Sequence, residues 1–389
     1  MILKNARLIG ALSGGFSSES TQILLQDGKI TRIFEGEVPK DSAQEIYDCR
    51  GMTLLPGLFD IHTHVTGLVD FDHTDKKALD AQAERYLEYG FTTIRDCGSM
   101  DRCVNDLRDR IDRGLACGPN ILSCGKIVTP TETSSKDSLL PMYSEADGPY
   151  EMRKAARREI AEGADFIKTM ASGSAFHRQG IPNQPIIMED ELSALVQAAN
   201  KKNTYVAAHA HADSSIALCI KSGVRTIEHA TYIKEETIRL LMDTPECFLV
   251  PTLAAMHVSV PDEEGFWSRR LGEMLKICCE NISTTYEVGA KLGFGTDSAP
   301  GMEQYEQGME FRFRKELCGM ENTDILLQAT RYSAEIVGLA DTTGTIKEGY
   351  TADLILVDGK PDQDISVMYH KPVRVIKGGR FIAGYQTWT

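Results

Sequence analysis

Two histidines at the end of an apolar run are the feature that most constrains this sequence. The run Leu55–Ile61 leads directly into His62-Thr63-His64. In a β-strand, this spacing of two residues puts both imidazoles on the same face. Paired imidazole nitrogens are good ligands for a borderline divalent cation such as zinc. Taken alone, the motif predicts a metal site and an ordinary pair of histidines equally well.

Four further apolar segments end in side chains that can bind a metal or hold a proton. They lead to Lys168, to His209 and His211, to His229, and to Asp297. Singly, each has an ordinary explanation, because a buried lysine often pairs with an acid and an aspartate often caps a helix. Five such strand ends in one chain instead predict a single site assembled along one edge of a sheet.

Composition excludes several other classes of protein. A net charge of −14 over 389 residues argues against nucleic acid or an anionic membrane as a partner. The apolar runs are too short to span a bilayer, and charges interrupt the first residues, so we expect no signal peptide. The ten cysteines include no Cys-x-x-Cys pair. This favours reduced thiols and a cytoplasmic location.

Strand-like and helix-like segments alternate between about residues 55 and 344. Gly90, Gly163 and Gly223 follow three of the amphipathic segments, where a left-handed helix end favours glycine. Eight alternating pairs predict an α/β fold, a (β/α)8 TIM barrel whose active site lies at the carboxyl ends of the strands. The expected strands end near His62, Arg95, Cys124, Lys168, His209, His229, Thr252 and Asp297, and the clearest helices cover 77–89, 150–162, 189–202 and 234–242.

The two ends of the chain contain short β-type segments instead. Residues 1–54 include a turn at Asp27-Gly28 between two such segments, and residues 345–389 include two more. Neither end can bury a core alone, so we expect the two to form one small β-sandwich beside the barrel. The stretch 129–149 is rich in Ser, Thr, Pro and acidic residues, which predicts a loop over the active-site end of the barrel.

The order of these motifs resembles the amidohydrolase superfamily, in particular the binuclear metal-dependent branch that contains prolidase-like dipeptidases and imidazolonepropionase-like proteins. The resemblance covers nearly the whole chain. The residues that carry it are Pro56–His64, Gly163–Lys168, His209-Ala-His211, Thr226–His229, Gly295-Thr-Asp297 and the terminal Gly344–Val357.

The resemblance implies two divalent metal ions, with zinc expected. By this likeness one metal binds His62, His64 and Asp297, the other binds His209 and His229, and Lys168 bridges them after CO2 has converted its amine to a carbamate. It also implies that a hydroxide held between the metals attacks the substrate, while Asp297 shuttles the proton to the leaving nitrogen.

Three residues are expected to contact the substrate. His211 follows His209 by two residues, so it could replace it as the ligand or contact the reacting carbonyl. Tyr232 resembles the residue with which related dipeptidases bind a carboxylate, and Arg178 offers a guanidinium for the same purpose. The chain departs from its relatives after the third strand, where Cys124–Thr131 lacks their histidine and Lys126 is the nearest substitute.

The sequence therefore predicts a metal-dependent hydrolase that cleaves an amide bond, of a dipeptide or an N-acyl amino acid. The alternatives are a cyclic-amide hydrolase or a deaminase of a nitrogen heterocycle, and a non-catalytic barrel used for binding or assembly. Deaminase relatives place a glutamate where this chain has Ala212 and lack the bridging lysine, while non-catalytic members lose ligands. The resemblance also implies a homo-oligomer.

Overall fold

The computed structural model describes residues 1–37, 44–67, 72–131, 141–176, 181–257, 265–300 and 308–382. The chain forms two compact units. The first comprises Met1–Asp60, Glu84–Thr93 and Gln307–Thr389, and the second comprises Ile61–Ala83 and Ile94–Glu306.

In the first unit, strands from both ends of the chain join one eight-stranded sheet with the order β17-β16-β15-β5-β1-β2-β3, in which β4 pairs with β1. The strands are β1 (Ile2–Leu8), β2 (Ser18–Gln26), β3 (Lys29–Phe34), β4 (Ile46–Asp48), β5 (Thr53–Pro56), β15 (Leu354–Val357), β16 (Arg374–Lys377) and β17 (Arg380–Phe381). The turn between β2 and β3 is the predicted one, since Asp27 and Gly28 have φ values of 51° and 73°. Apolar side chains from both ends, among them Leu3, Ile23 and Leu354, share one core. The sandwich stays a prediction.

The first unit also contains three helices from the last quarter of the chain, α8 (Met309–Glu316), α9 (Asn322–Leu327) and α10 (Ser333–Ile336). The helix α8 contains a buried ion pair. The Nε of Arg314 lies 2.9 Å from Oε1 of Glu310, and both side chains are fully buried.

The second unit contains a six-stranded sheet in which every neighbouring pair is parallel, with the order β10-β9-β11-β12-β13-β14. Its strands are β9 (Ile127–Thr129), β10 (Tyr143–Glu145), β11 (Ile167–Met170), β12 (Val206–Ala210), β13 (Thr226–His229) and β14 (Phe248–Val250). A three-stranded sheet has the order β6-β7-β8, formed by β6 (Leu58–Thr63), β7 (Phe91–Asp96) and β8 (Asn120–Ser123). Parallel strands bring their carboxyl ends to one edge of the sheet.

Within the second unit, the segment 292–298 is joined by backbone hydrogen bonds to the six-stranded sheet and to the carboxyl end of β6. The Gly293 amide donates to the Leu249 carbonyl at 2.8 Å, and the Asp297 amide donates to the His62 carbonyl at 2.7 Å. On the other side, the Asp165 amide donates to the Ser123 carbonyl at 2.8 Å, which joins the start of β11 to the end of β8.

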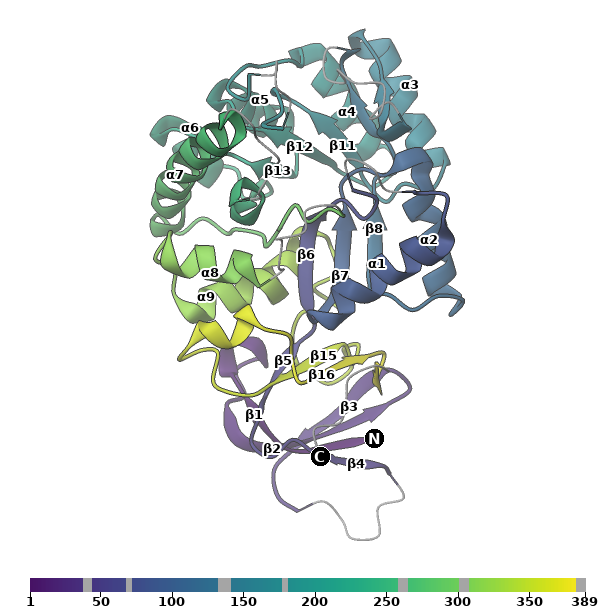
Figure 1. Cartoon of the computed structure of the whole chain (residues 1–389), viewed down its shortest axis with the longest axis vertical. Coiled ribbons are helices and arrows are strands. Elements are labelled where there is room, and N and C mark those ends of the chain that lie inside the picture. The colour runs from purple at the N-terminus through teal and green to yellow at the C-terminus, as the bar shows by residue number, and fades with distance from the viewer. Residues whose placement is uncertain are drawn as a thin grey trace. The chain divides into compact units, whose positions relative to one another are not determined.

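Helices alternate with these strands and lie outside them (Figure 1). They are α1 (Lys76–Glu88), α2 (Cys103–Asp112), α3 (Gly148–Ala161), α4 (Glu189–Asn200), α5 (Asp213–Ser222), α6 (Glu235–Met242) and α7 (Phe266–Glu287). The apolar side chains of α4 are buried, including Leu192 and Leu195. The three glycines that were expected to end helices, Gly90, Gly163 and Gly223, have φ values of 85°, 92° and 83°.

The loop predicted for 129–149 is wrong over part of its length. Residues 132–140 lie outside the described residues, but Tyr143–Glu145 form β10 and α3 begins at Gly148. Tyr143 pairs with Ile127 and Ser144 pairs with Val128 in parallel register. Strands of three residues are too short for a polar and apolar alternation to reveal them.

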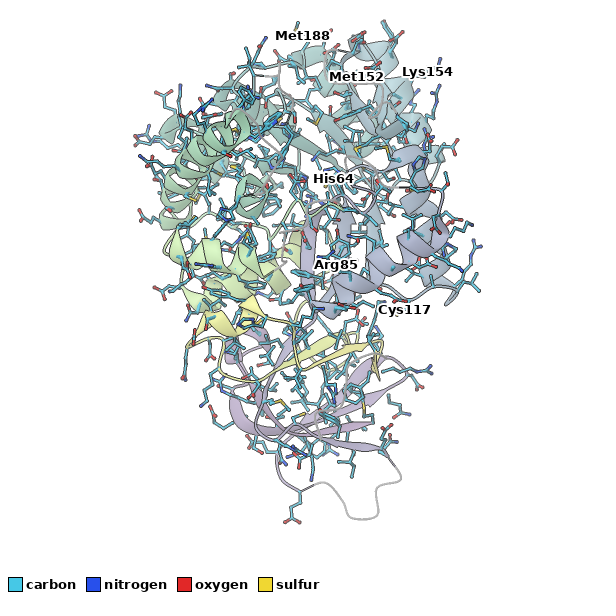
Figure 2. All side chains as sticks on the ribbon, in the orientation of Figure 1. His64, Arg85, Cys117, Met152, Lys154 and Met188 are labelled. Atoms are coloured by element: carbon cyan, nitrogen blue, oxygen red, sulfur yellow. The ribbon has the colours of Figure 1, made fainter. Side chains whose placement is uncertain are left out.

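The arrangement of side chains separates the interior of the second unit from its surface. His64 lies inside, whereas Lys154 and Met188 project outward from its periphery (Figure 2). None of the ten cysteines is joined in a disulfide. No helix within the described ranges has both the length and the apolar character needed to cross a membrane.

Candidate metal centre

The predicted ligands converge at the carboxyl ends of the strands in the second unit. None of these residues is more than 8% exposed: His62, His64, Lys168, His209, His211, His229 and Asp297. Among the described residues, potential ligand atoms come within 4.8 Å of one another in His62, His229 and Asp297, and again in His209, His211 and His229. His229 belongs to both groups, so the two sets adjoin.

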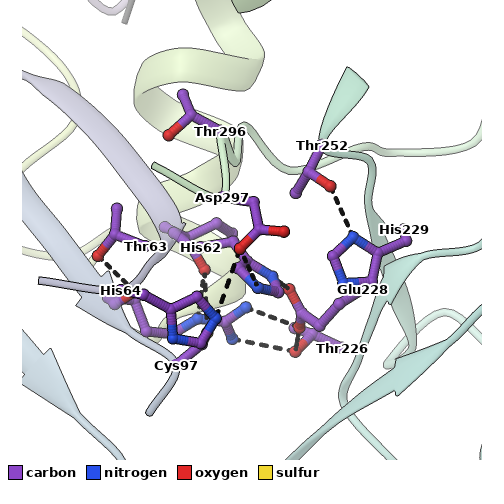
Figure 3. Close-up of polar contacts among 12 residues, drawn as sticks. His62, Thr63, His64, Cys97, Thr226, Glu228, His229, Thr252, Thr296 and Asp297 are labelled. Carbon is purple, nitrogen blue, oxygen red and sulfur yellow. Dashed lines mark hydrogen bonds and ion pairs between the residues drawn. The ribbon is translucent and has the colours of Figure 1, made fainter. Parts of the chain in front are cut away.

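Asp297 also lies close to His64, which belongs to neither of these two groups. One of its carboxylate oxygens, Oδ1, lies 3.4 Å from Nε2 of His62 and 3.4 Å from Nε2 of His64 (Figure 3). Such distances suit three groups around a common cation better than direct hydrogen bonds between them.

Three imidazoles form the second set. The ring centroids of His209 and His211 lie 4.5 Å apart, those of His209 and His229 lie 4.7 Å apart, and His211 stacks on His229 at 4.9 Å. Both His209 and His211 therefore point into the site, and the choice between them as a ligand stays open at this level.

Unusual backbone conformations turn two of these residues into the site. In the register of β12 and β13, His209 is opposite Glu228, and His229 is opposite Ala210. A regular strand would send His229 to the face opposite that of Glu228. The φ of His229 is 71°, and that of Asp297 is 58°, both in the left-handed region. Such backbone strain in non-glycine residues is typical of functional sites.

The histidines have one ring nitrogen engaged and the other directed to the site. Nδ1 of His62 bonds to Oε2 of Glu228 at 2.6 Å, and Nδ1 of His64 lies 3.2 Å from the Gly98 carbonyl. Nε2 of His209 lies 3.2 Å from the Gly173 carbonyl. Since carboxylates and carbonyls only accept, these nitrogens carry the proton, and the opposite nitrogens keep a lone pair for a cation.

The side chain that holds His62 is Glu228, which was not predicted from the sequence. Oε1 of the fully buried Glu228 accepts hydrogen bonds from Arg95 at 2.8 Å and from Thr226 at 2.6 Å, while Oε2 faces His62. Arg95 also donates from Nε to the Ile61 carbonyl at 2.6 Å. The only signal for these residues was their position in the predicted strands, one beside His229 and one at the end of β7.

Burial sets the charge state of the site. It lowers the pKa of His64 to about 4 and that of His211 to about 3, and it lowers the pKa of His62, His209 and His229 well below the usual value. All five imidazoles are therefore neutral at pH 7, as metal binding requires. Burial also raises the pKa of Asp297 to about 7, so this carboxyl can accept and release a proton near neutrality.

Lys168 lies in the middle of these groups. Besides burial and neighbouring imidazoles, its charge contributes to the lowered pKa of each of the five histidines. The side chain is 2% exposed, yet no hydrogen bond or ion pair joins its Nζ to any part of the chain that the structure describes. An ammonium in that position costs free energy, whereas an anionic carbamate between two cations would be stabilised. The donor set thus fits a pair of divalent metals.

The substrate contacts that were predicted from the sequence meet different outcomes. Arg178 lies outside the described residues. Tyr232 is half-buried, and its amide donates to the His211 carbonyl at 3.0 Å. Burial raises the pKa of Tyr232, and the charge of Arg270 on α7 partly offsets this shift. Lys126 bonds to Asp101 at 2.9 Å, so it is engaged elsewhere.

Comparison with known proteins places this chain among hydrolases. The model of the amidohydrolase family matches residues 53–382. An ochratoxinase from Aspergillus niger is 28% identical, over 90% of this chain and 80% of its own length.

Two solved structures cover almost the whole fold. A prolidase complexed with N-methylphosphonate-L-proline has a TM-score of 0.86 and 29% identity over 98% of both chains. A Xaa-Pro dipeptidase with methionine bound in its active site has a TM-score of 0.85 and 28% identity, over 98% of this chain and 99% of its own.

Proposed function

Because this chain belongs to the amidohydrolase family and is a hydrolase, we propose that it cleaves the amide bond of a dipeptide or an N-acyl amino acid with two divalent metal ions. One observation carries the proposal. The charge of the buried Lys168 acts on five neutral imidazoles and on the Asp297 carboxyl, yet its amine forms no ion pair among the described residues. That set of donors suits two cations and a bridging anion.

The proposed ligands follow from the two groups of side chains. His62, His64 and Asp297 would hold one metal, and His209 and His229 would hold the other. Lys168, as a carbamate, would reach both, and zinc suits this mixture of nitrogen and oxygen donors. His209 is preferred to His211 because its bond to the Gly173 carbonyl fixes the proton on Nε2 and leaves Nδ1 for the cation.

The catalytic roles of the chain's own residues follow from their protonation. When bound, the two metals would activate a water molecule and polarise the scissile carbonyl. Asp297 would take a proton from that water and pass it to the leaving nitrogen, a two-way transfer for which a positioned carboxyl is suited. Glu228 would keep the Nδ1 proton on His62, so that Nε2 stays a ligand throughout.

A free carboxylate next to the scissile bond is the proposed recognition element. Tyr232 follows His229 closely, and Arg270 lies near enough for its charge to act on the pKa of Tyr232. The Arg270 guanidinium is partly desolvated, which lowers its pKa and strengthens its attraction for an anion. His211 would contact the reacting carbonyl. Arg178 remains a proposal from the sequence, because it lies outside the described residues.

The finer architecture is also proposed. Residues 55–344 would form a closed (β/α)8 barrel, with 292–298 as its eighth strand, and 1–54 with 345–389 would form the β-sandwich. The hydrogen bonds from Gly293 to Leu249 and from Asp297 to His62 support the closure.

Ten cysteines without a disulfide support a cytoplasmic location.

Metal analysis followed by a substrate screen tests this function. Protein purified without chelator should contain about two zinc ions per chain, since each proposed metal has two or three protein ligands besides the bridge. It should then hydrolyse members of a library of dipeptides and N-acyl amino acids, but not the corresponding amides that lack a free carboxylate. Active protein with no metal would contradict the metal mechanism.

Lys168→Ala tests the bridge. The variant should keep its fold, lose one metal and lose most of its activity, because the remaining side chains provide no anion between the cations. Short carboxylic acids added with zinc should restore part of the activity. Turnover and metal content close to those of the wild type would exclude the carbamate.

A further inference from the structure

The structure offers a candidate for the group that the sequence lacks after the third strand. No histidine follows β8, and Lys126 is engaged with Asp101. The strand β10 was not expected there. It carries Tyr143, whose side chain lies against the apolar cluster of Met100, Ile127, Met142 and Met170.

The register of the sheet puts Tyr143 on the face of the metal ligands. Tyr143 is opposite Ile127 on β9, and Val128, the next residue of β9, is opposite Thr169 on β11. By the same register Ile127 is level with Lys168. Residues level with one another across a parallel sheet point to the same face. Tyr143 therefore shares a face with Lys168, two strands away.

Close contacts around Gly98 bring this face up to His64. A Cβ on Gly98 would lie 2.7 Å from Cδ1 of Ile127 and 3.4 Å from Cε1 of His64. Ile127 and the His64 ring thus flank the same glycine, and Tyr143 lies next to Ile127 in the sheet. This places the tyrosine on the side of the site that contains His62, His64 and Asp297.

The phenol is available as a donor. Among the described residues it makes no hydrogen bond. Burial, and then the charge of Asp297, raise the pKa of Tyr143 to about 12, so the hydroxyl keeps its proton at neutral pH. Tyr143 is partly buried beside the apolar cluster, and its hydroxyl can donate a hydrogen bond to a substrate oxygen.

We propose that the Tyr143 phenol donates a hydrogen bond to the carbonyl oxygen of the scissile amide, at the place where relatives have a histidine. This inference rests on the proposed function. The hydrogen bond strengthens as negative charge develops on that oxygen during attack by water. The phenol keeps its proton throughout, while Asp297 carries the proton from the water to the leaving nitrogen.

Tyr143→Phe provides the test, because it removes only the hydroxyl. With two metals bound, the variant should lose about 10²–10³-fold in kcat, the usual loss for one donor to a developing oxyanion. KM should change much less. Tyr143→His should recover part of the loss. Tyr47→Phe in the first unit is the matched control and should leave kcat unchanged.

A binding measurement gives a readout independent of turnover. A phosphonate analogue of a dipeptide substrate, which carries tetrahedral oxygens, should bind Tyr143→Phe at least about tenfold more weakly than the wild type. The amino acid released as product should bind the wild type and Tyr143→Phe with equal affinity.

The outcomes separate the two proposals. Suppose that the wild-type protein cleaves a substrate of the library, and that Tyr143→Phe has the same kcat and the same affinity for the analogue. This result would overturn the role of Tyr143 but leave the proposed function intact. A wild-type protein that neither cleaves any amide in the library nor binds the analogue would overturn the proposed function, and this inference with it.

Discussion

Asp297 combines a left-handed backbone, with a φ of 58°, and a buried carboxyl whose pKa is raised to about 7. We expect Asp297→Asn to keep both metals, because an amide oxygen can still approach a cation, and to lose about 10²–10⁴-fold in kcat, because it cannot accept a proton. Elemental analysis and kinetics on the same preparation check this. A fully metallated variant within a few-fold of wild-type turnover would remove Asp297 from the proton-transfer role.

Glu228 acts on the site through His62. Glu228→Gln weakens the 2.6 Å bond to Nδ1 and leaves the buried Arg95 without its counter-charge. Loss of such a supporting partner typically lowers metal affinity or activity about 10–100-fold, and competition with a chelator would measure it. Glu159→Gln is the control, since Glu159 is equally buried and pairs with Arg102 outside the site. Equal effects in both variants would mean that only stability had changed.

At the scale of single residues, the sequence predicted the side chains that converge but not those that hold them. His62, Lys168 and His229 were recognisable because each ends an apolar run. Glu228 and Arg95 were not, because a buried acid and a buried base in a strand look like surface charges until their partners are known. Tyr143 lies in a strand too short to predict.

At the scale of elements, the short distance between the segment 292–298 and β6 fixes the position of His62. Gly295, in the segment 292–298, approaches β6 so closely that an added Cβ would lie 2.8 Å from Cβ of His62 and 2.7 Å from Cγ1 of Val250. Gly295→Ala should therefore displace His62, lower metal content and destabilise the fold by about 1–3 kcal/mol, as overpacking does.

Gly272→Ala is the matched control for that variant. Gly272 lies on the exposed face of α7, and a Cβ there would meet no atom within 4 Å. We expect the free energy of unfolding to rise by about 0.4–1 kcal/mol, because alanine restricts the unfolded chain. Urea denaturation of both variants compares them, and a Gly295→Ala protein as stable and as metallated as the wild type would contradict the steric argument.

The longer elements were predictable because their signals are periodic. The helices α3, α4 and α6 begin and end within two residues of the predicted bounds. The strand that was predicted to end near Asp297 is not a regular strand in the structure. The segment 292–298 forms only isolated β-bridges, at Leu292 and Ser298. Its two glycines and the left-handed Asp297 interrupt a regular ladder there.

At the scale of the whole molecule, the buried site makes stability depend on pH. Five histidines have a lowered pKa in the fold, whereas burial raises the pKa of Asp96 to about 8 and that of Asp297 to about 7. As the pH falls from about 6.5 to about 4, the unfolded chain takes up five protons on these histidines, while the fold already holds two extra protons on the aspartates. The unfolded chain thus binds about three more protons than the fold, so a falling pH favours unfolding.

Chelator-treated protein should therefore be most stable between about pH 6 and 7 and lose stability towards pH 4. Above pH 7 it should also lose some stability, because the two buried carboxyls ionise only at a cost. Zinc should reduce the alkaline loss, since a cation favours the ionised carboxylate of Asp297, while the cost of ionising Asp96 remains. Urea denaturation across this range is the measurement, and a flat profile from pH 6.5 to 4 would contradict the burial of these groups.

The hydrogen-bonded imidazoles give the protein a spectroscopic reporter of its own. The ring protons of His62, His64 and His209 are held by a carboxylate or a backbone carbonyl and are buried from water. Such protons exchange slowly enough to appear as downfield resonances in nuclear magnetic resonance spectra. With nine histidines in the chain, these signals could be assigned by single substitutions. They would then follow metal loading and substrate binding directly, without any turnover.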